Sequence, residues 1–85
     1  MKLLVSDFDG TVFRNGEVTS EDLNGINQWR EIGNVFAIAT GRMSIGIVRE
    51  KLHGYMDYLI CENGAKIYDK RDNLLFEKIC RHKSA

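Results

Sequence analysis

Residues 3–11, Leu-Leu-Val-Ser-Asp-Phe-Asp-Gly-Thr, constrain the fold more than any other stretch of the chain. An apolar run ends there in two carboxylates, Asp7 and Asp9, and then in Gly10, which allows a sharp turn. The run has no polar alternation, so it predicts a strand buried on both faces. If the chain stays extended, both acids project to the same side, and buried acids are costly unless they are paired or bind a metal ion. The plainer alternative is a polar strand end followed by a turn.

The rest of the chain repeats the pattern of apolar strand, polar turn and helix. Apolar strands are predicted at residues 35–39 and 58–61, and helices between Thr19 and Gly33 and between Ser44 and Gly54. Thr19 and Ser44 are the expected caps, and the two glycines end the helices. The turns that follow the two strands contain Thr40-Gly41-Arg42 and Asn63-Gly64.

Two hairpins are also predicted. Asn15-Gly16 between apolar flanks is a strong signal for a tight turn, so a small flap should follow the acidic loop. The flap is interpreted either as a gate or as a plain surface hairpin. Residues 65–69 and 74–78 resemble the two arms of a C-terminal hairpin.

Strands that alternate with helices imply right-handed crossovers, and therefore an α/β fold with a parallel sheet of three strands. The three polar turns then share one edge of the sheet, where ligands bind in open α/β sheets. Hydroxyls and free backbone amides there suit a phosphate group, and a carboxylate pair suits a divalent cation such as Mg²⁺. Convergence of the turns is the argument for a site.

Several other sites are excluded by their motifs. The first strand is not followed by G-x-G-x-x-G, which argues against dinucleotide binding, and the chain has no P-loop lysine motif. A calcium loop that began at Asp7 would need glycine and glutamate where Val12 and Val18 stand. Phosphoryl transfer through a carboxylate remains: Asp7 would attack phosphorus, Asp9 would serve as acid and base, and Thr40 and the Gly41 backbone would stabilise the developing charge.

Length, charge and composition argue against several classes of partner. The chain has 85 residues, enough for one domain, and its formal net charge is zero without a basic stripe, so we expect no nucleic-acid partner. No apolar segment approaches the roughly 20 residues that span a bilayer, and we expect no membrane partner. Cys61 and Cys80 form neither a disulfide framework nor, with distant His53 and His82, a zinc site. A reducing, cytoplasmic location is expected, with Cys61 a buried thiol.

These motifs resemble the haloacid dehalogenase (HAD) superfamily of phosphatases, in particular its Cof-type sugar-phosphatase-like branch. The resemblance extends from Lys2 to about Phe76 and implies a Rossmann-like core and a Mg²⁺-dependent phosphatase that acts through an aspartyl-phosphate on a phosphorylated small molecule such as a sugar phosphate. It implies that Asp7 is the nucleophile and a metal ligand, and that Asp9 is the acid/base and a metal ligand through its carbonyl. The residues that it implies for phosphate or substrate binding are Gly10, Thr11, Thr40, Gly41, Arg42 and Asn63. The matching motifs are residues 7–11, 39–42 and 63–65.

The chain also departs from that family. It has no counterpart of the family's lysine, of its second acidic metal-binding loop or of its cap domain. Residues 1–79 therefore resemble the N-terminal portion of a HAD core, followed by a tail at 80–85, and whether this chain is itself an enzyme is open. We expect weak or no turnover; the alternative is a non-catalytic module that binds phosphate or oligomerises. One edge of Leu3-Leu4-Val5 should be unpaired, which favours self-association.

Overall fold

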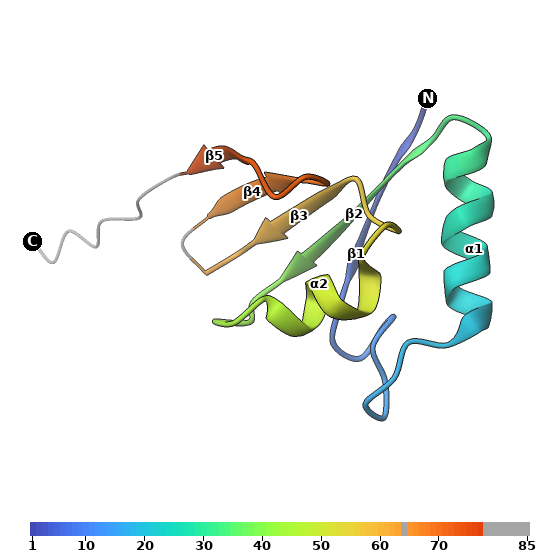
Figure 1. The fold of residues 1–85 in the computed structure, drawn as a ribbon, viewed down its shortest axis with the longest axis horizontal. Helices are drawn as coiled ribbons and strands as arrows, with labels where there is room; N and C mark the ends of the chain where they lie inside the picture. Colours follow the sequence, from blue (N-terminus) through green and yellow to red (C-terminus); the bar gives the residue numbers. More distant parts are fainter. Residues whose placement is uncertain (64, 78–85) are drawn as a thin grey trace, which may run out of the picture.

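One mixed sheet of five strands, in the order β1-β2-β3-β4-β5, organises the chain (Figure 1). The structure is a computed structural model that describes residues 1–63 and 65–77. The first three strands are parallel, which confirms the predicted α/β fold, and β4 and β5 are antiparallel. The elements are β1 (Leu3–Asp7), α1 (Ser20–Glu31), β2 (Val35–Thr40), α2 (Gly46–Leu52), β3 (Tyr58–Cys61), β4 (Lys66–Asp69) and β5 (Leu74–Glu77).

The C-terminal hairpin differs from the expectation in one respect. It does not stand apart from the three parallel strands, because β4 pairs with β3 and extends the same sheet. The pairing aligns Ile60 with Ile67, and Ile67 with Phe76 in β5. Apolar side chains on one face of neighbouring strands stabilise such pairing, and this long-range match was not visible in the hairpin sequence itself.

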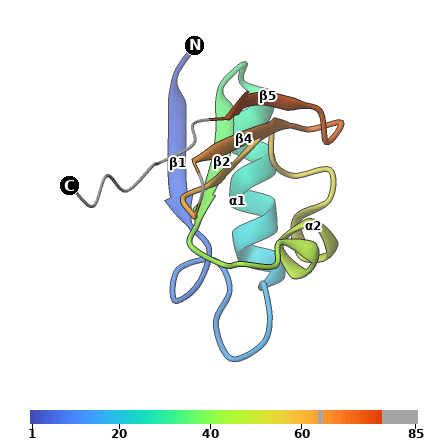
Figure 2. The same ribbon diagram turned by 90° about the vertical axis from the view of Figure 1, so that its left-hand side faces the viewer.

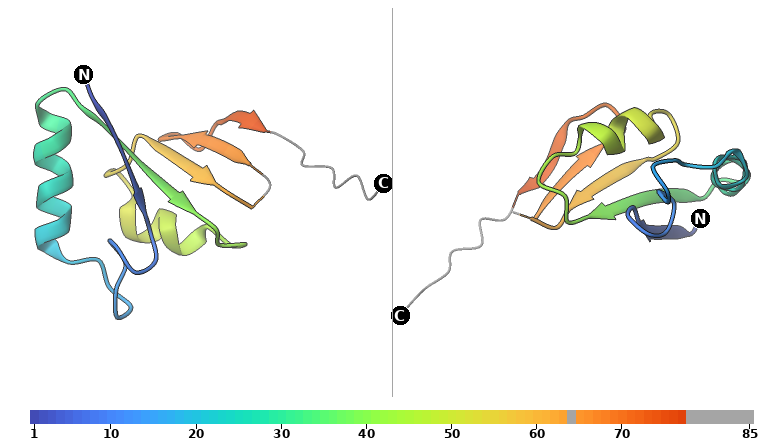
Figure 3. Two further views of the ribbon diagram at one scale, coloured as in Figure 1. Left: turned by 180° about the vertical axis from the view of Figure 1, so that it is seen from behind. Right: turned by 90° about the horizontal axis from the view of Figure 1, so that it is seen from below.

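Both helices lie on one face of the sheet (Figures 2 and 3). Two right-handed crossovers made in the same direction along a sheet place their helices on the same side. The core forms between this face and the helices, and its fully buried members include Phe8, Phe36, Ile38, Leu52 and Leu59. The hydrophobic core of the described residues therefore lies on the helical side of the sheet.

The ends of the helices show which local signals the fold uses. The Thr19 hydroxyl accepts a hydrogen bond from the Asp22 backbone N–H at 3.2 Å, which confirms the predicted cap of α1. Gly33 follows the helix with φ +92°, a conformation that favours glycine. The predicted cap of α2 is wrong: that helix begins at Gly46 after Ile45, and no side chain caps it. Ser44 precedes the N-cap residue, Ile45, by one position.

The flap forms at the predicted position. Asn15 and Gly16 have φ of 54° and 79°, the left-handed pair that a tight hairpin turn requires. Arg14 and Glu17 exchange backbone hydrogen bonds of 2.9 and 3.0 Å across it. The Arg14 guanidinium also pairs with Asp22 of α1 at 2.9 Å, so the flap is tied to the start of the helix.

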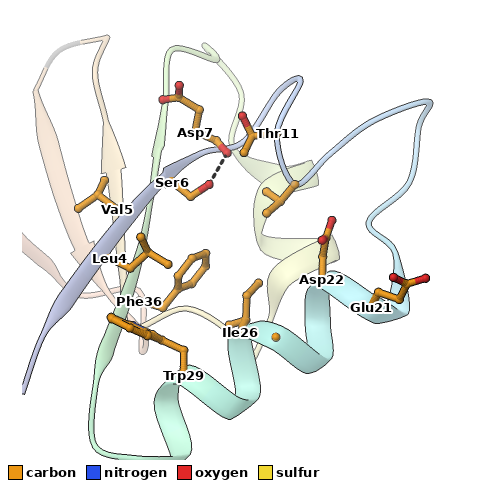
Figure 4. A pocket seen from close by; sticks show the side chains of 12 residues that line it. Leu4, Val5, Ser6, Asp7, Thr11, Glu21, Asp22, Ile26, Trp29 and Phe36 are labelled. Carbon is orange, nitrogen blue, oxygen red and sulfur yellow. Dashed lines mark hydrogen bonds between the residues drawn. The ribbon is translucent and has the colours of Figure 1, made fainter.

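Strand β1 lies at the edge of the sheet, and its only partner among the described strands is β2. The exposed fraction is 61% for Leu3 and 45% for both Leu4 and Val5. The expectation of a strand buried on both faces is therefore wrong, whereas the expected unpaired apolar edge is present. A groove of about 440 Å³ runs between β1 and α1, and Figure 4 shows Leu4, Ile26 and Trp29 at its sides.

The remaining predictions concern the tail, the two cysteines and the membrane. The tail at 80–85, Cys80 and Gly64 are among the residues that are not described. Cys61 is buried as expected, and burial raises the pKa of its thiol. Among residues 1–63 and 65–77, neither helix has the length and apolar character needed to cross a bilayer.

Candidate active site

The polar turns after β1, β2 and β3 meet at one edge of the sheet. Asp7 is aligned with Ala39 in β2, and Thr40 with Cys61 in β3, so the three strands end side by side. A hollow of about 240 Å³ opens at this edge. Its lining residues are Asp7, Phe8, Asp9, Ala39, Thr40, Gly41 and Glu62. Both predicted acids and the predicted hydroxyl therefore border one space.

Arg42 binds the carboxylate of Asp9 through two parallel hydrogen bonds. Its Nη2 lies 2.7 Å from Oδ1 and its Nε 2.8 Å from Oδ2. This bidentate geometry is the strong form of an arginine–carboxylate pair. The hydrogen bonds from Arg42 lower the pKa of the Asp9 carboxyl, and Asp9 in turn raises the pKa of Arg42. Asp9 is thus held as a carboxylate with both oxygens engaged.

Asn63 fixes the loop that follows β2. Its Nδ2 donates to the carbonyl oxygen of Gly41 at 2.9 Å and lies 3.0 Å from Sδ of Met43. The Thr40 hydroxyl oxygen accepts from the Arg42 backbone N–H at 3.1 Å, and the Thr40 residue is only 3% exposed. These contacts hold the loop against the end of β3. In this structure Asn63 supports the loop and does not line the hollow.

Two of the predicted binding residues serve the loop after β1. Gly10 has φ +80°, and its N–H donates to the carbonyl of Phe13 at 2.9 Å, so this amide is already engaged. The Thr11 N–H lies 3.4 Å from the Phe8 carbonyl oxygen, and Thr11 borders the groove between β1 and α1. Neither residue borders the hollow with Asp9.

The structure adds two features that sequence reasoning did not identify. Glu62 borders the hollow, and its backbone N–H donates to the Thr40 carbonyl oxygen at 2.8 Å. Its position directly after the third apolar strand, beside Asn63, was the available signal. The bidentate pair of Arg42 with Asp9 had no signal in the sequence, because the two residues lie far apart in the chain.

The fit to a magnesium ion is partial. In the described ranges, 1–63 and 65–77, no three histidine, cysteine or acidic side chains come together as metal ligands. The Asp9 carboxylate is taken by Arg42, which leaves the carboxylates of Asp7 and Glu62 among the acids that border the hollow. Mg²⁺ is commonly held by one or two protein oxygens together with waters and substrate phosphate, so this donor set suits that mode of binding.

Comparisons with known proteins identify the family and the fold. A family model described as haloacid dehalogenase-like hydrolase matches residues 4–85. BT1666 from Bacteroides thetaiotaomicron, one of the phosphatases of the HAD enzyme superfamily, aligns with a TM-score of 0.80 and 21% identity over 95% of this chain, a likeness of fold alone. A haloacid dehalogenase-like hydrolase from B. subtilis aligns with a TM-score of 0.77 and 29% identity over 92%.

The present chain is much shorter than these two proteins. It spans 31% of the Bacteroides chain and 28% of the B. subtilis chain. No curated protein matches it.

Proposed function

The chain belongs to the haloacid dehalogenase-like hydrolase family, and we propose that it carries the nucleophile half of a Mg²⁺-dependent phosphatase. The observation that carries the proposal is the hollow bordered by Asp7, Asp9 and Thr40 at the carboxyl edge of the parallel strands. We infer that residues 1–79 are the N-terminal portion of the catalytic core, of the Cof-type branch. The buried, free thiol of Cys61 in this chain supports the proposal that the protein works in a reducing, cytoplasmic compartment.

In the proposed reaction an Asp7 carboxylate oxygen attacks the phosphorus of a phosphate monoester. The bond between phosphorus and the ester oxygen breaks, and the leaving oxygen takes a proton from a general acid. Water then attacks the aspartyl-phosphate, which releases inorganic phosphate and restores Asp7. Splitting the reaction in this way lowers the barrier of an otherwise very slow hydrolysis.

Asp9 is the proposed acid and base. As long as Arg42 occupies both of its oxygens, its lowered pKa keeps it ionised and unable to donate a proton. Water activation needs the ionised form, whereas leaving-group protonation needs the protonated one. The pair with Arg42 must therefore open before the first step, and an incoming phosphate group, which also binds arginine bidentately, can open it.

Magnesium would be held by the Asp7 carboxylate and the Asp9 carbonyl, and when bound it neutralises negative charge on the phosphoryl group. Thr40 keeps a hydroxyl hydrogen to donate, because its oxygen accepts from the Arg42 amide. Arg42 supplies planar donors that match phosphate. The substrate class proposed from these groups is a phosphorylated small molecule, with a sugar phosphate favoured by the family resemblance.

Hydrolysis of p-nitrophenyl phosphate with Mg²⁺ tests the proposal. The expected result is slow, Mg²⁺-dependent turnover that Asp7→Asn abolishes, since the amide is not a nucleophile. Glu31→Gln, an exposed acid at the end of α1, is the matched control and should leave the rate unchanged. Equal rates for the wild-type and Asp7→Asn chains would exclude catalysis by this chain.

The second candidate is a non-catalytic module that binds phosphate or oligomerises. The closed pair of Arg42 with Asp9 holds the proposed acid in its ionised form, which disfavours catalysis, and the exposed edge of β1 favours pairing with a second copy. The backbone groups on the unpaired edge of β1 would then hydrogen-bond to the partner's edge strand. Sedimentation at micromolar concentration should show a dimer or larger species, and a single monomeric species would contradict self-association.

A further inference from the structure

Two phenylalanine rings and one guanidinium lie together beside the hollow. The rings of Phe8 and Phe13 are stacked, with centroids 4.8 Å apart and planes inclined by 8°. The Cζ atom of Arg42 lies 5.7 Å from the Phe8 centroid and 5.6 Å from the Phe13 centroid. A guanidinium within about 6 Å of a ring face is attracted by the negative face of the ring. Because the two rings stack on each other, the guanidinium lies beside the stacked pair and not over the faces of both rings; we call this pair the aromatic platform (Phe8 and Phe13).

The backbone fixes Phe13 in this position. Its N–H donates to the Phe8 carbonyl at 2.8 Å, and its own carbonyl accepts from the Gly10 N–H at 2.9 Å. Phe13 also forms a bridge with Asp9. The loop that carries the proposed acid/base thus also carries the outer ring of the platform. Phe8 is fully buried in the core, whereas Phe13 is half-buried and can be replaced at lower cost.

Arg42 needs such support, because residues 41–45 form no helix or strand. Its partner Asp9 is half exposed, with 51% of the side chain accessible, and an incoming phosphate group competes with Asp9 for the same N–H groups, so the ion pair alone does not keep the guanidinium in place when phosphate binds. Arginine stacks through its flat face and donates hydrogen bonds in its plane. In this structure Nε and Nη2 of Arg42 bond Asp9 while Cζ stays 5.7 and 5.6 Å from the two ring centroids, so contact with the rings is compatible with hydrogen bonding to Asp9 or to an incoming phosphate group.

We propose that Phe13 is a positioning residue: with Phe8 it holds the Arg42 guanidinium beside the hollow, where Arg42 pairs with Asp9 and binds the phosphate group of a phosphate monoester. This inference rests on the proposed phosphate site. The phosphate displaces Asp9 from the N–H groups while Arg42 keeps its contact with the platform.

The experiment follows the Nε–H signal of Arg42 by NMR in the ¹⁵N-labelled chain and uses inorganic phosphate as the probe. Phosphate should shift this signal in the wild type. In Phe13→Leu the signal should lose the part of its ring-current shift that Phe13 contributes, and the Kd for phosphate should rise about two- to five-fold, the factor that corresponds to an exposed cation–π contact. Phe13→Tyr should restore both readouts, because its ring presents the same face.

Tyr68→Leu is the matched control. Its ring lies 5.0 Å from Cζ of a different arginine, Arg49, so its loss should leave the Arg42 signal and the phosphate Kd unchanged. An unchanged Arg42 signal and Kd in folded Phe13→Leu would overturn the inference. Equal effects in Tyr68→Leu, or phosphate that leaves the wild-type Arg42 signal unmoved, would do the same.

Two further results separate the possible failures. If Phe13→Leu does not fold, Phe13→Trp decides: its larger ring should shift the Arg42 signal and tighten phosphate binding, and no change in either would overturn the inference. Absence of hydrolysis together with the expected Arg42 changes would contradict the proposed function alone. Hydrolysis together with an Arg42 signal that is the same in the wild type and in the Phe13 variants would contradict only the role of Phe13.

Discussion

Arg30 and Asp57 form a bidentate ion pair, with Nε 3.1 Å from Oδ2 and Nη2 2.9 Å from Oδ1. The pair joins the end of α1 to the segment before β3. Asp57 Oδ2 also accepts from the Phe36 backbone N–H at 2.9 Å, and Arg30 Nη1 donates to the Gly54 carbonyl. Both side chains are less than a quarter exposed, so this network lies at the amino end of the sheet, opposite the candidate site.

Arg30→Met should lower the free energy of unfolding by about 2–3 kcal/mol, because it leaves a partly buried carboxylate with fewer donors. Urea denaturation measures the change. Arg14→Met is the matched control: its pair with Asp22 at 2.9 Å is more exposed, and its loss should cost less than about 1 kcal/mol. Equal losses in the two variants would show that the Arg30 network has no special role.

The same ion pair predicts that the free energy of unfolding decreases at acidic pH. Burial raises the pKa of Asp57, but the hydrogen bonds from Arg30 and Phe36 outweigh it, and the net pKa is lowered. A carboxyl whose pKa is lower in the folded state contributes stability above its unfolded pKa, about 3.9, and this contribution disappears as the pH falls through the folded pKa. The urea concentration at the unfolding midpoint, measured from pH 7 to pH 2.5, should therefore decrease once the pH is below about 4. The fall should be shallower in Asp57→Asn, and parallel curves would contradict this assignment.

Local signals in the sequence predicted local structure well. Thr19 caps α1 and Asn15-Gly16 makes the flap turn, because each acts through atoms a few residues away. Ser44 failed as a cap because a hydroxyl residue near a helix start marks only an approximate boundary.

Features that depend on residues distant in the chain were harder to predict. The exposed edge of β1 was expected only from the family resemblance, and the apolar run alone predicted burial. The acids and Thr40 could be placed at one edge because parallel strands end together. The ion pair between Arg42 and Asp9 could not be predicted, because it depends on the directions of two side chains, which the spacing of residues in the sequence does not determine.

The edge of β1 gives a prediction about association. Val5→Lys places a charge in the middle of the exposed edge, and charged side chains on edge strands oppose pairing with another chain. The sedimentation coefficient should fall to that of a monomer at the same concentration. Ser20→Lys, at the exposed first residue of α1, adds the same charge away from the edge and should leave association unchanged. Association that survives Val5→Lys would place the interface elsewhere.

Magnesium binding should depend on Asp7 and tolerate the loss of the Asp9 carboxylate. Both Asp9 carboxylate oxygens are held by Arg42 at 2.7 and 2.8 Å, so the proposed contribution of Asp9 to the metal is its backbone carbonyl, which Asp9→Asn retains.

A ligand that binds only the folded state stabilises it by about 2.7 kcal/mol at a hundred times its Kd. Thermal unfolding with and without Mg²⁺ should show a rise in Tm for the wild-type chain and for Asp9→Asn, and none for Asp7→Asn. Ca²⁺ at the same concentration controls for ionic strength and for preference between the two ions. A rise in Tm that Asp9→Asn abolishes and Asp7→Asn keeps would reverse the two roles and make the Asp9 side chain the ligand.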